Sequence, residues 1–394
     1  MNFFILSVIK AAVVAFVLLT TLAYLQWVER KVIAHIQVRL GPSRVGPHGL
    51  LQPLADVIKL ITKEDLIPPH VNKFLYVLAP FLAVTMALIS ISVVPFGTEI
   101  TAFGQTTWMQ LTDLNIGLLV ILAISSMGVY GIALGGWASN NKYALLGGLR
   151  SSAQMISYEL PLSIAIASPL LLSNTLSLRQ LVDTQAGFGF LPHWNIFRGP
   201  WPQIVSFVVF LIAAFAETNR VPFDLPEAEN ELVAGFHTEY SSMKFAAFFM
   251  AEYSNMVTVS CVATILFLGG WHPLWPAQYG SSLAPAAVFA GGGALMLYHG
   301  LHPARRKDRI TLPIFGIIFL AVAVALVAPA VQSVFVPLFW FLAKVGIILF
   351  LFIWVRGTLP RFRYDQLMRF AWKVLFPVAL VNLLVTGFLV ALLG

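Results

Sequence analysis

Apolar residues fall in ten long runs along the chain, and the polar residues are concentrated in the segments between them. A helix needs roughly 20 apolar residues to cross a hydrocarbon core about 30 Å thick, and all but the fifth run approach that length. We therefore predict an all-α integral membrane protein, a polytopic bundle of transmembrane helices that forms a single domain over residues 1–394. The predicted spans are 4–28, 74–95, 115–137, 152–172, 201–217, 244–268, 284–301, 310–330, 335–355 and 374–393.

The composition supports this prediction. Hydrophobic residues make up 59% of the chain and charged residues 10%, against roughly 25% charged residues in an ordinary soluble domain. A soluble core cannot take up so many apolar side chains, because polar ones must still cover most of its surface. The composition therefore excludes a soluble protein.

Lysine and arginine lie mostly on one side of the predicted bundle. Of the 24 in the chain, 20 fall in alternate loops, at 29–73, 138–151, 218–244, 302–309 and 356–373. The opposite loops contain only Arg179 and Arg198, while Lys10 and Lys344 fall inside predicted spans. Because cytoplasmic loops retain basic residues, we predict that both termini lie on the outer face of the membrane. The net charge of +7 then reflects topology and not binding of nucleic acid.

The first inner loop, 29–73, contains a different type of helix. Apolar residues recur in it at helical spacing, and polar residues take the opposite face. The segment is too short to span and stops before Pro68, so we predict an amphipathic helix in the membrane interface. A helix packed on a partner protein is an equally good interpretation, and both can hold. The apolar positions are Leu50, Leu51, Leu54, Val57, Ile58 and Ile61; the polar ones are Gln52, Asp56, Lys59 and Lys63.

The sequence predicts no metal site and no redox centre in the chain itself. Its one cysteine, Cys261, lies in an apolar run, so the chain can form neither an internal disulfide nor a thiolate-ligated iron-sulfur cluster. The eight histidines lie in or beside loops or at a helix end, whereas haem between membrane helices usually needs facing histidines deep in two spans. Any redox centre must therefore belong to a partner.

Six of the 17 acidic residues are gathered in one inner loop, 217–243. They are interleaved with apolar residues such as Val221 and Leu232, which a solvated acidic loop, the alternative interpretation, would hardly need. Crowded carboxylates in a partly apolar setting have raised pKa values, since desolvation and mutual repulsion disfavour the charged form. Such a group can exchange protons near neutral pH. Its members are Glu217, Asp224, Glu227, Glu229, Glu231 and Glu239.

Two further acids, Glu159 and Glu252, lie inside predicted spans. An ionisable side chain is costly there and is a functional hypothesis by default. Lys344, near the middle of the ninth span, is the cation expected opposite them. A buried ion pair with a purely structural role is the competing explanation.

Four blocks of sequence are long and specific. They read ERKVIAHIQVRLGP with GLLQPLAD, SNNKYALLGGLRSSAQMISYE, AETNRVPFDLPEAENELVAGFHTEYS, and VRGTLPRFRYDQLM. In these blocks the chain resembles the family formed by the H subunit of bacterial NADH-quinone oxidoreductase and its counterpart, subunit 1 of mitochondrial complex I. The blocks cover the inner loops and their flanking helices, and their order and spacing match through about residue 268 and again from about 335.

The resemblance implies a membrane subunit of a proton-translocating NADH:quinone oxidoreductase that is not active alone. FMN and iron-sulfur clusters on partner subunits would carry electrons from NADH to the substrate, ubiquinone or menaquinone. The implied partners are the peripheral-arm subunits with the terminal iron-sulfur cluster and quinone head site, the small membrane subunits, the antiporter-like subunits and the lipid bilayer.

The matched motifs also imply roles for individual residues. The residues that would line or brace the quinone chamber are Arg30, Gln37, Arg39, Phe223 and Phe236. The acidic chain that begins a proton path toward the antiporter-like subunits would consist of Glu159, Glu217, Asp224, Glu227, Glu229, Glu231 and Glu252, with Lys344 as a buried cation near it.

The sequence departs from the family in two places. Ala228 and Asn230 stand where the family's acidic loop has glycine and serine, which affects only the expected local backbone conformation. Residues 284–330 are an apparent insertion of two helices beyond the family's usual eight. Two rival functions are the related subunit of a membrane-bound hydrogenase or formate hydrogenlyase, and a stand-alone ion or solute transporter. The transporter is disfavoured because no internal repeat is visible.

Overall fold

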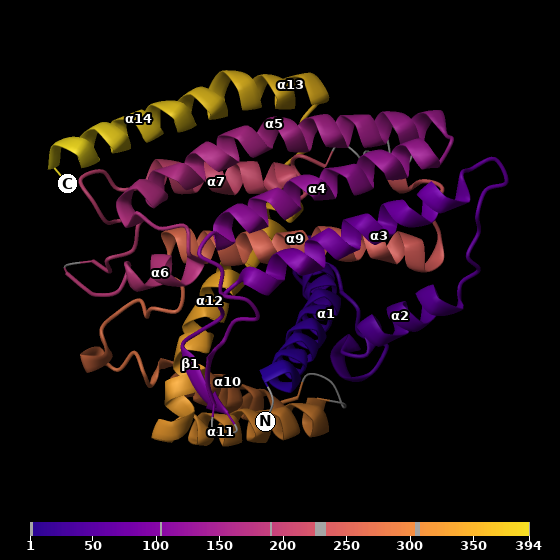
Figure 1. Cartoon of the computed structure of the whole chain (residues 1–394). Helices are drawn as coiled ribbons and strands as arrows, with labels where there is room; N and C mark the ends of the chain where they lie inside the picture. The colour runs from indigo at the N-terminus through magenta and orange to yellow at the C-terminus, as the bar shows by residue number, and fades with distance from the viewer. Residues whose placement is uncertain (1–2, 103–104, 190, 225–233, 304–307, 394) are drawn as a thin grey trace.

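The computed structural model describes residues 3–102, 105–189, 191–224, 234–303 and 308–393 (Figure 1). Each predicted span coincides with a helix, so the prediction of an all-α polytopic membrane protein is confirmed. In the described ranges, nine helical segments are long and apolar enough to cross a membrane. They comprise α1 (Phe3–Ile36), α3 (Lys73–Ser90), α4 (Gly117–Ala138), α5 (Lys142–Ser173), α9 (Ser242–Phe267), α10 (Ala284–Leu301), α11 (Asp308–Ala325), α12 (Pro329–Thr358), and α13 (Tyr364–Phe370) continued by α14 (Phe376–Leu393).

The remaining predicted span is α7 (Ile204–Glu217), whose 14 residues rise only about 21 Å. That length is less than the roughly 30 Å of a hydrocarbon core. The helix stops where Asn219 adopts a left-handed backbone conformation (φ 50°) and turns the chain away. Its last residue, Glu217, is therefore buried inside the protein and not exposed at its surface.

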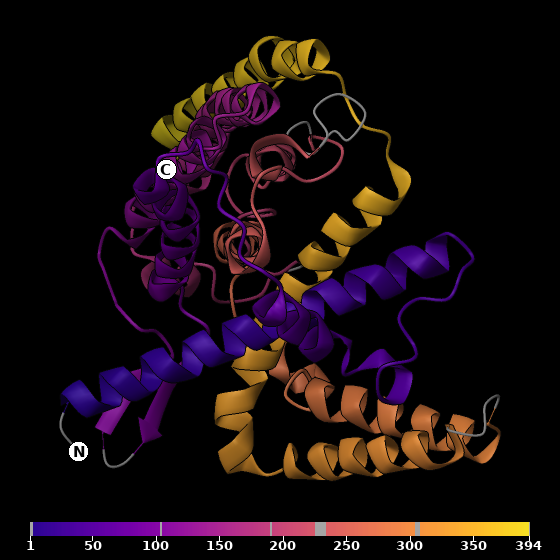
Figure 2. The same cartoon turned by 90° about the vertical axis from the view of Figure 1, so that its right-hand side faces the viewer.

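A layered bundle is formed by helices whose axes are roughly aligned, namely α3, α4, α5, α7, α9 and α14 (Figure 1). Within it α5 contacts α4, α7 and α14, and α3 contacts α4 and α9. The turned view shows α1 and α12 crossing this bundle at a steep angle (Figure 2). Glycines let α4 and α5 approach closely, since a Cβ on Gly148 would lie 3.2 Å from Gly136 Cα.

Shorter elements fill the connections. The amphipathic helix is α2 (Gln52–Thr62), and its apolar side chains, such as Leu54 and Ile61, are exposed in this chain. A hairpin of antiparallel strands, β1 (Glu99–Ala102) and β2 (Gln105–Trp108), was not predicted from the sequence. The other short elements are η1 (Pro47–Gly49), η2 (Ile91–Val93), α6 (Leu178–Asp183), η3 (Gly235–His237), η4 (Ala277–Tyr279) and the π-helical η5 (Ala371–Leu375), which joins α13 to α14.

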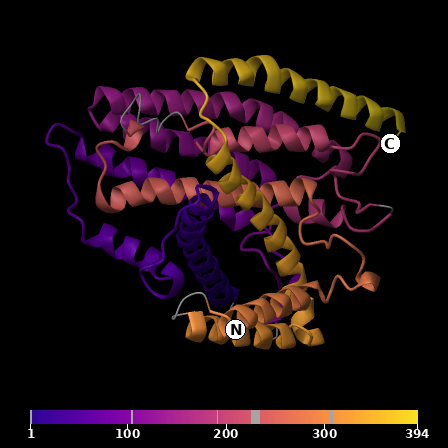
Figure 3. The same ribbon diagram turned by 180° about the vertical axis from the view of Figure 1, so that it is seen from behind.

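The apparent insertion forms a helical hairpin, α10 and α11, that packs mainly on itself at one side of the bundle (Figure 3). The two backbones approach closely where a Cβ on Gly293 would lie 2.9 Å from Gly316 O. At the start of α11, Asp308 Oδ1 lies 3.4 Å from His48 Nε2. The outward side chains of both helices are largely exposed in this chain.

Two hydrophobic cores position the candidate site. The larger lies mainly between α5, α7, α9 and α12 and includes the fully buried Phe210 and Phe341. The smaller lies between α3, α4 and the start of α9, where the ring centroids of Tyr76 and Tyr240 are 4.2 Å apart. Glu217 lies between the two cores, because residues of each core line a separate cavity beside it.

Candidate functional site

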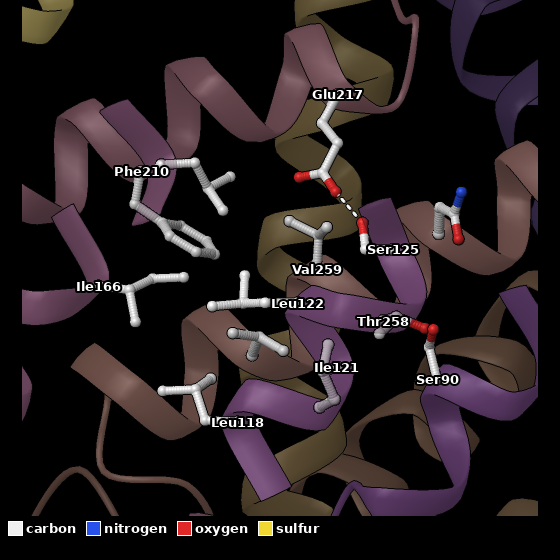
Figure 4. A pocket seen from close by; sticks show the side chains of 13 residues that line it. Ser90, Leu118, Ile121, Leu122, Ser125, Ile166, Phe210, Glu217, Thr258 and Val259 are labelled. Carbon is white, nitrogen blue, oxygen red and sulfur yellow. Dashed lines mark hydrogen bonds between the residues drawn. The ribbon is translucent and has the colours of Figure 1, made fainter. Parts of the chain in front are cut away.

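Two carboxylates are held by adjacent serines of α4. Ser125 Oγ donates a hydrogen bond to Glu217 Oε1 of α7 (Figure 4), and Ser126 Oγ donates one to Glu159 Oε1 of α5. Successive helix positions point about 100° apart, so neighbouring serines can reach two different helices. The structure thus brings two of the predicted acids to one short segment of α4.

Two small cavities, of about 30 and 20 Å³, lie beside Glu217. A water molecule needs about 10–15 Å³ of such space, so each cavity can hold at least one. Glu252 of α9 lines the smaller cavity, and Asn255 lines both. A water-sized space therefore lies between Glu217 and Glu252. With Glu159, Glu252 brings to three the number of predicted acids that the structure places in this region.

The larger of these cavities extends from Glu217 and Ser125 at one end to Ser90 and Thr258 at the other (Figure 4). Most of its wall is apolar, with Leu118 and other core residues. Thr258 Oγ1 is buried and has no hydrogen-bond partner in the part of the chain that the structure describes. A water in this cavity would satisfy that hydroxyl, whose isolation otherwise costs about 1–3 kcal/mol.

Glu29 of α1 is the centre of a buried charge cluster that the sequence did not single out. Its Oε1 accepts hydrogen bonds from Arg220 and Arg356, and its Oε2 accepts one of 2.7 Å from Tyr253 Oη. Arg220 Cζ also lies 4.1 Å from the centroid of the Tyr253 ring. Glu29 borders a basic loop, where a charge is easily interpreted as solvated. The sequence feature that could have revealed this cluster was Arg220, the one lysine or arginine between residues 217 and 239.

Asp224, another predicted acid, is buried in the loop after α7. Its Oδ2 accepts a 3.0 Å hydrogen bond from Arg361, in the segment between α12 and α13. Gln154 of α5 fixes the same loop by donating to Ala216 O and Phe223 O, at 2.8 and 2.7 Å. The loop therefore has a defined position against α5. The predicted acids that lie outside the described residues are Glu227, Glu229 and Glu231.

The predicted chamber residues fall into two groups. Arg30, Gln37 and Arg39 are exposed near or just beyond the C-terminal end of α1. Arg30 donates to Asp56 of α2 at 2.7 Å, and Arg39 Nε donates to Gln37 Oε1 at 2.7 Å. Arg30 thus joins α1 to α2, whose apolar face is exposed.

Phe223 and Phe236, the other two predicted chamber residues, are buried within this chain. The Phe223 ring lies 5.4 Å from that of Tyr158, and the Phe236 ring lies 5.1 Å from that of Phe248. Phe236 also lines the cavity shared by Glu217 and Glu252. Both rings are therefore packed inside this chain, and their roles in a quinone chamber stay predictions.

Lys344 of α12 lies against the end of α9. Its Nζ donates to the carbonyl oxygens of Leu268, Gly270 and His272, at 2.6, 2.9 and 2.6 Å. It also lies 4.2 Å from the centroid of the Trp194 ring. The three donors of the ammonium are thus all used, and no ion pair found in the described ranges joins Lys344 to a carboxylate. The cation predicted to oppose Glu159 and Glu252 instead binds carbonyls beyond a helix C-terminus, where positive charge is favoured.

His237 lies in η3, between the acidic loop and α9. The rings of Phe236, Phe245 and Phe249 contact it. Burial lowers the pKa of His237 from its ordinary value of 6.5 to about 4, so the imidazole is neutral at physiological pH. Across the residues that the structure describes, no group of three or more His, Cys, Asp and Glu side chains is placed to hold a metal ion.

Comparisons with known proteins agree on one family. A family model described as NADH dehydrogenase matches residues 9–387. The NADH-quinone oxidoreductase H subunit numbered 1 in Solibacter usitatus is 72% identical over 390 residues, which cover 99% of this chain and 98% of that protein. The H subunit numbered 2 in Koribacter versatilis is 53% identical, with 99% and 98% coverage. The H subunit numbered 2 in Geobacter metallireducens is 46% identical, with 100% and 97% coverage.

The match to the Solibacter protein also bears on residues 284–330. Because it covers 99% of this chain, the α10–α11 hairpin is shared with that relative and is not peculiar to this sequence. The helical fold, the matched family model and the high identity over nearly the whole length lead to one conclusion. The chain belongs to the NADH dehydrogenase family, as an H subunit of NADH-quinone oxidoreductase, a membrane subunit of complex I.

Proposed function

We propose that the chain forms part of the quinone-binding chamber of its complex and couples quinone reduction to proton translocation through buried carboxylates. One observation carries the proposal: Glu217 and Glu159 are held by adjacent serines, and Glu252 faces Glu217 across a water-sized cavity. Ionisable groups are costly among membrane helices and are typical of proton relays. The three acids lie on α5, α7 and α9, and the serines of α4 hold two of them, an arrangement that supports a path for protons along the interior of the subunit.

The chemistry of the substrate explains why acids belong here. Reduction of a quinone to a quinol takes up two electrons and two protons, so it changes the charge near the bound head group. We propose that the electrons come from FMN and iron-sulfur clusters on partner subunits, with ubiquinone or menaquinone as the acceptor. This chain would supply the apolar passage for the quinone tail and the groups that respond to the change in charge.

The Glu29 cluster offers a physical link from the chamber to the acids. Glu29 lies directly before Arg30, at the end of α1 where the chamber is proposed. Its partner Arg220 follows Glu217 by three residues in a loop that Gln154 holds in place. A shift in the charge balance around Glu29 would thus reach Glu217 through one short, fixed segment. Buried charge clusters of this type respond to a neighbouring charge because low-dielectric surroundings screen it weakly.

Docking to the peripheral arm is proposed for the exposed inner end of α1 and the face of α2. The apolar side chains Leu54 and Ile61 are exposed there, beside the charged Arg30 and Arg39. We further propose contacts with the small membrane subunits and the antiporter-like subunits, and a place in a bacterial inner membrane with both termini on the outer face. The names of the relatives favour the quinone enzyme over the hydrogenase-linked alternative.

The test is substitution of Glu217 by glutamine in the assembled complex. We expect NADH-to-quinone turnover to fall at least about tenfold, the effect of losing one proton-transfer group, while NADH oxidation by an artificial acceptor stays normal. The matched control is Glu99→Gln, which changes an exposed acid of the β1–β2 hairpin. Equal quinone reductase rates in the two variants would reject the proposed role of Glu217.

A further inference from the structure

A cavity much larger than the two beside Glu217 lies away from the acids. It is a groove of about 680 Å³ between the first half of α1 and the middle of α12, with the β1–β2 hairpin at one side and α9 behind it. Along α1 its lining runs from Leu6 to Thr21, a distance of about 22 Å. Apolar side chains make up nearly all of the surface.

Protein does not close this groove in the described part of the chain. Ile9, Val13 and Val17 of α1 and Leu342 of α12 line it, and each leaves more than 40% of its surface exposed. Both helices are membrane-spanning segments, so the medium beside the groove is hydrocarbon and not water. A void there would forfeit the dispersion contacts of its walls, so a flexible apolar chain is the occupant that fits. One leaflet is about 15 Å thick in its hydrocarbon part, close to the roughly 16 Å that the groove covers along α1 from Lys10 to Thr21.

A positive charge marks one side of the groove. Lys10 is the single lysine or arginine in its lining, and no acidic residue occurs there. The ammonium donates to Thr107 Oγ1, to Trp108 O at 3.0 Å and to Gln110 O at 3.3 Å. Its three donors are thus used within the chain, and it attracts an anion through its charge alone. On the Trp108 ring lies the guanidinium of Arg179, 4.6 Å from the centroid, which is also paired with Asp113 at 3.1 Å. Tryptophan and basic side chains of this kind are typical of the level of lipid head groups.

We propose that this groove binds one acyl chain of a phospholipid from the leaflet on the side of the β1–β2 hairpin, with its phosphate near Lys10 and Trp108. That leaflet is the outer one in the predicted topology. A quinone tail is a less suitable occupant, because Thr21, where the groove ends on α1, lies nine residues before Arg30, about 14 Å from the proposed chamber. The proposal does not depend on the proton path.

Gly346 provides a steric test. It lines the groove, and a Cβ added to it would meet nothing within 4 Å, so Gly346→Phe fills the groove without displacing backbone. Gly291→Phe is the matched control, because a Cβ on Gly291 of α10 also meets nothing within 4 Å and lies outside the groove. Lys10→Gln removes the charge and leaves the apolar lining intact.

The intact complex is reconstituted in nanodiscs of phosphatidylethanolamine and phosphatidylglycerol that contain a phospholipid with a photoreactive acyl chain. We expect label on peptides 6–21 and 338–349, reduced at least about fivefold by Gly346→Phe and about fivefold by Lys10→Gln, and unchanged by Gly291→Phe. A map of the wild-type complex should show a chain-shaped density in the groove, a result that does not require any variant to assemble. Equal labelling in the two glycine variants, or a map with a helix of another subunit or a quinone tail in the groove, would overturn the proposal.

Discussion

Replacing Glu29 with glutamine tests whether the buried charge cluster holds α1 to the loop after α7. Glu29 is 3% exposed and accepts from two guanidinium groups, of which Arg220 is also buried. Removing one member of a buried ion pair leaves an uncompensated charge and typically costs about 3–5 kcal/mol. Because glutamine keeps one carbonyl acceptor for Tyr253 or an arginine, we expect the lower end of that range, about 3 kcal/mol.

The neighbouring residue supplies the control. Arg30 forms an ion pair with Asp56, but its side chain is 43% exposed, and exposed pairs contribute about 0–1 kcal/mol. Arg30→Gln should therefore change stability by less than about 1 kcal/mol. The measurement is the free energy of unfolding of the subunit in bicelles, titrated with a denaturing detergent. Similar, small losses for Glu29→Gln and Arg30→Gln would refute the assignment of Glu29 as a buried structural acceptor.

A double substitution sharpens the result. If Glu29 and Arg220 act on each other directly, Glu29→Gln with Arg220→Gln should cost less than the sum of the two single changes, by about 0.5–3 kcal/mol. Additive losses would show that the two residues stabilise the fold independently.

Three further outcomes follow from the site and its surroundings. Ser125→Ala removes a hydrogen bond to Glu217, so quinone reductase turnover should fall about tenfold; a normal rate would contradict this. The pKa of His237 is lowered to about 4, so between pH 6.5 and 4 only the unfolded chain takes up a proton at this residue. The free energy of unfolding should therefore fall by about 3 kcal/mol over that range. His237→Leu should remove that loss when unfolding is measured as a function of pH. In Gly147→Ala the new Cβ would lie 2.7 Å from Gly235 Cα, so the free energy of unfolding should fall by about 1–3 kcal/mol. Gly291→Ala should not lower it in the same unfolding measurement.

Most of the fold could be predicted because hydrocarbon imposes a simple length rule on apolar runs. In the described residues the rule found the nine segments long enough to span and the shorter α7, including the α10–α11 hairpin, although α5 begins at Lys142, ten residues before the predicted start. It missed the β1–β2 hairpin, since Glu99, Thr101 and their neighbours are too few and too polar to produce a strand pattern that stands out. The angle at which α1 and α12 cross the bundle depends on side-chain packing and has no local signature.

The acids could be predicted for a similar reason, because a carboxylate inside an apolar run has a high cost and attracts notice. Their partners could not. Ser125 and Ser126 are ordinary residues of membrane helices, and only the packing of α4 against α5 and its approach to the end of α7 show which acids they reach. Lys344 was expected to oppose the acids, yet composition cannot tell a carboxylate partner from the backbone carbonyls that it binds. The roles of Phe223 and Phe236 at a chamber wall and the place of Glu227, Glu229 and Glu231 in the acidic chain stay predictions.

The most direct test of coupling between quinone reduction and the buried acids is infrared difference spectroscopy of the intact complex, recorded as the bound quinone is reduced. We expect a change in the carboxyl C=O stretching region, because a group near Glu217 gains or loses a proton. That change should disappear in Glu217→Gln and shift in frequency in Ser125→Ala. A carboxyl region that is the same in the wild-type complex and in Glu217→Gln would contradict the proposed coupling.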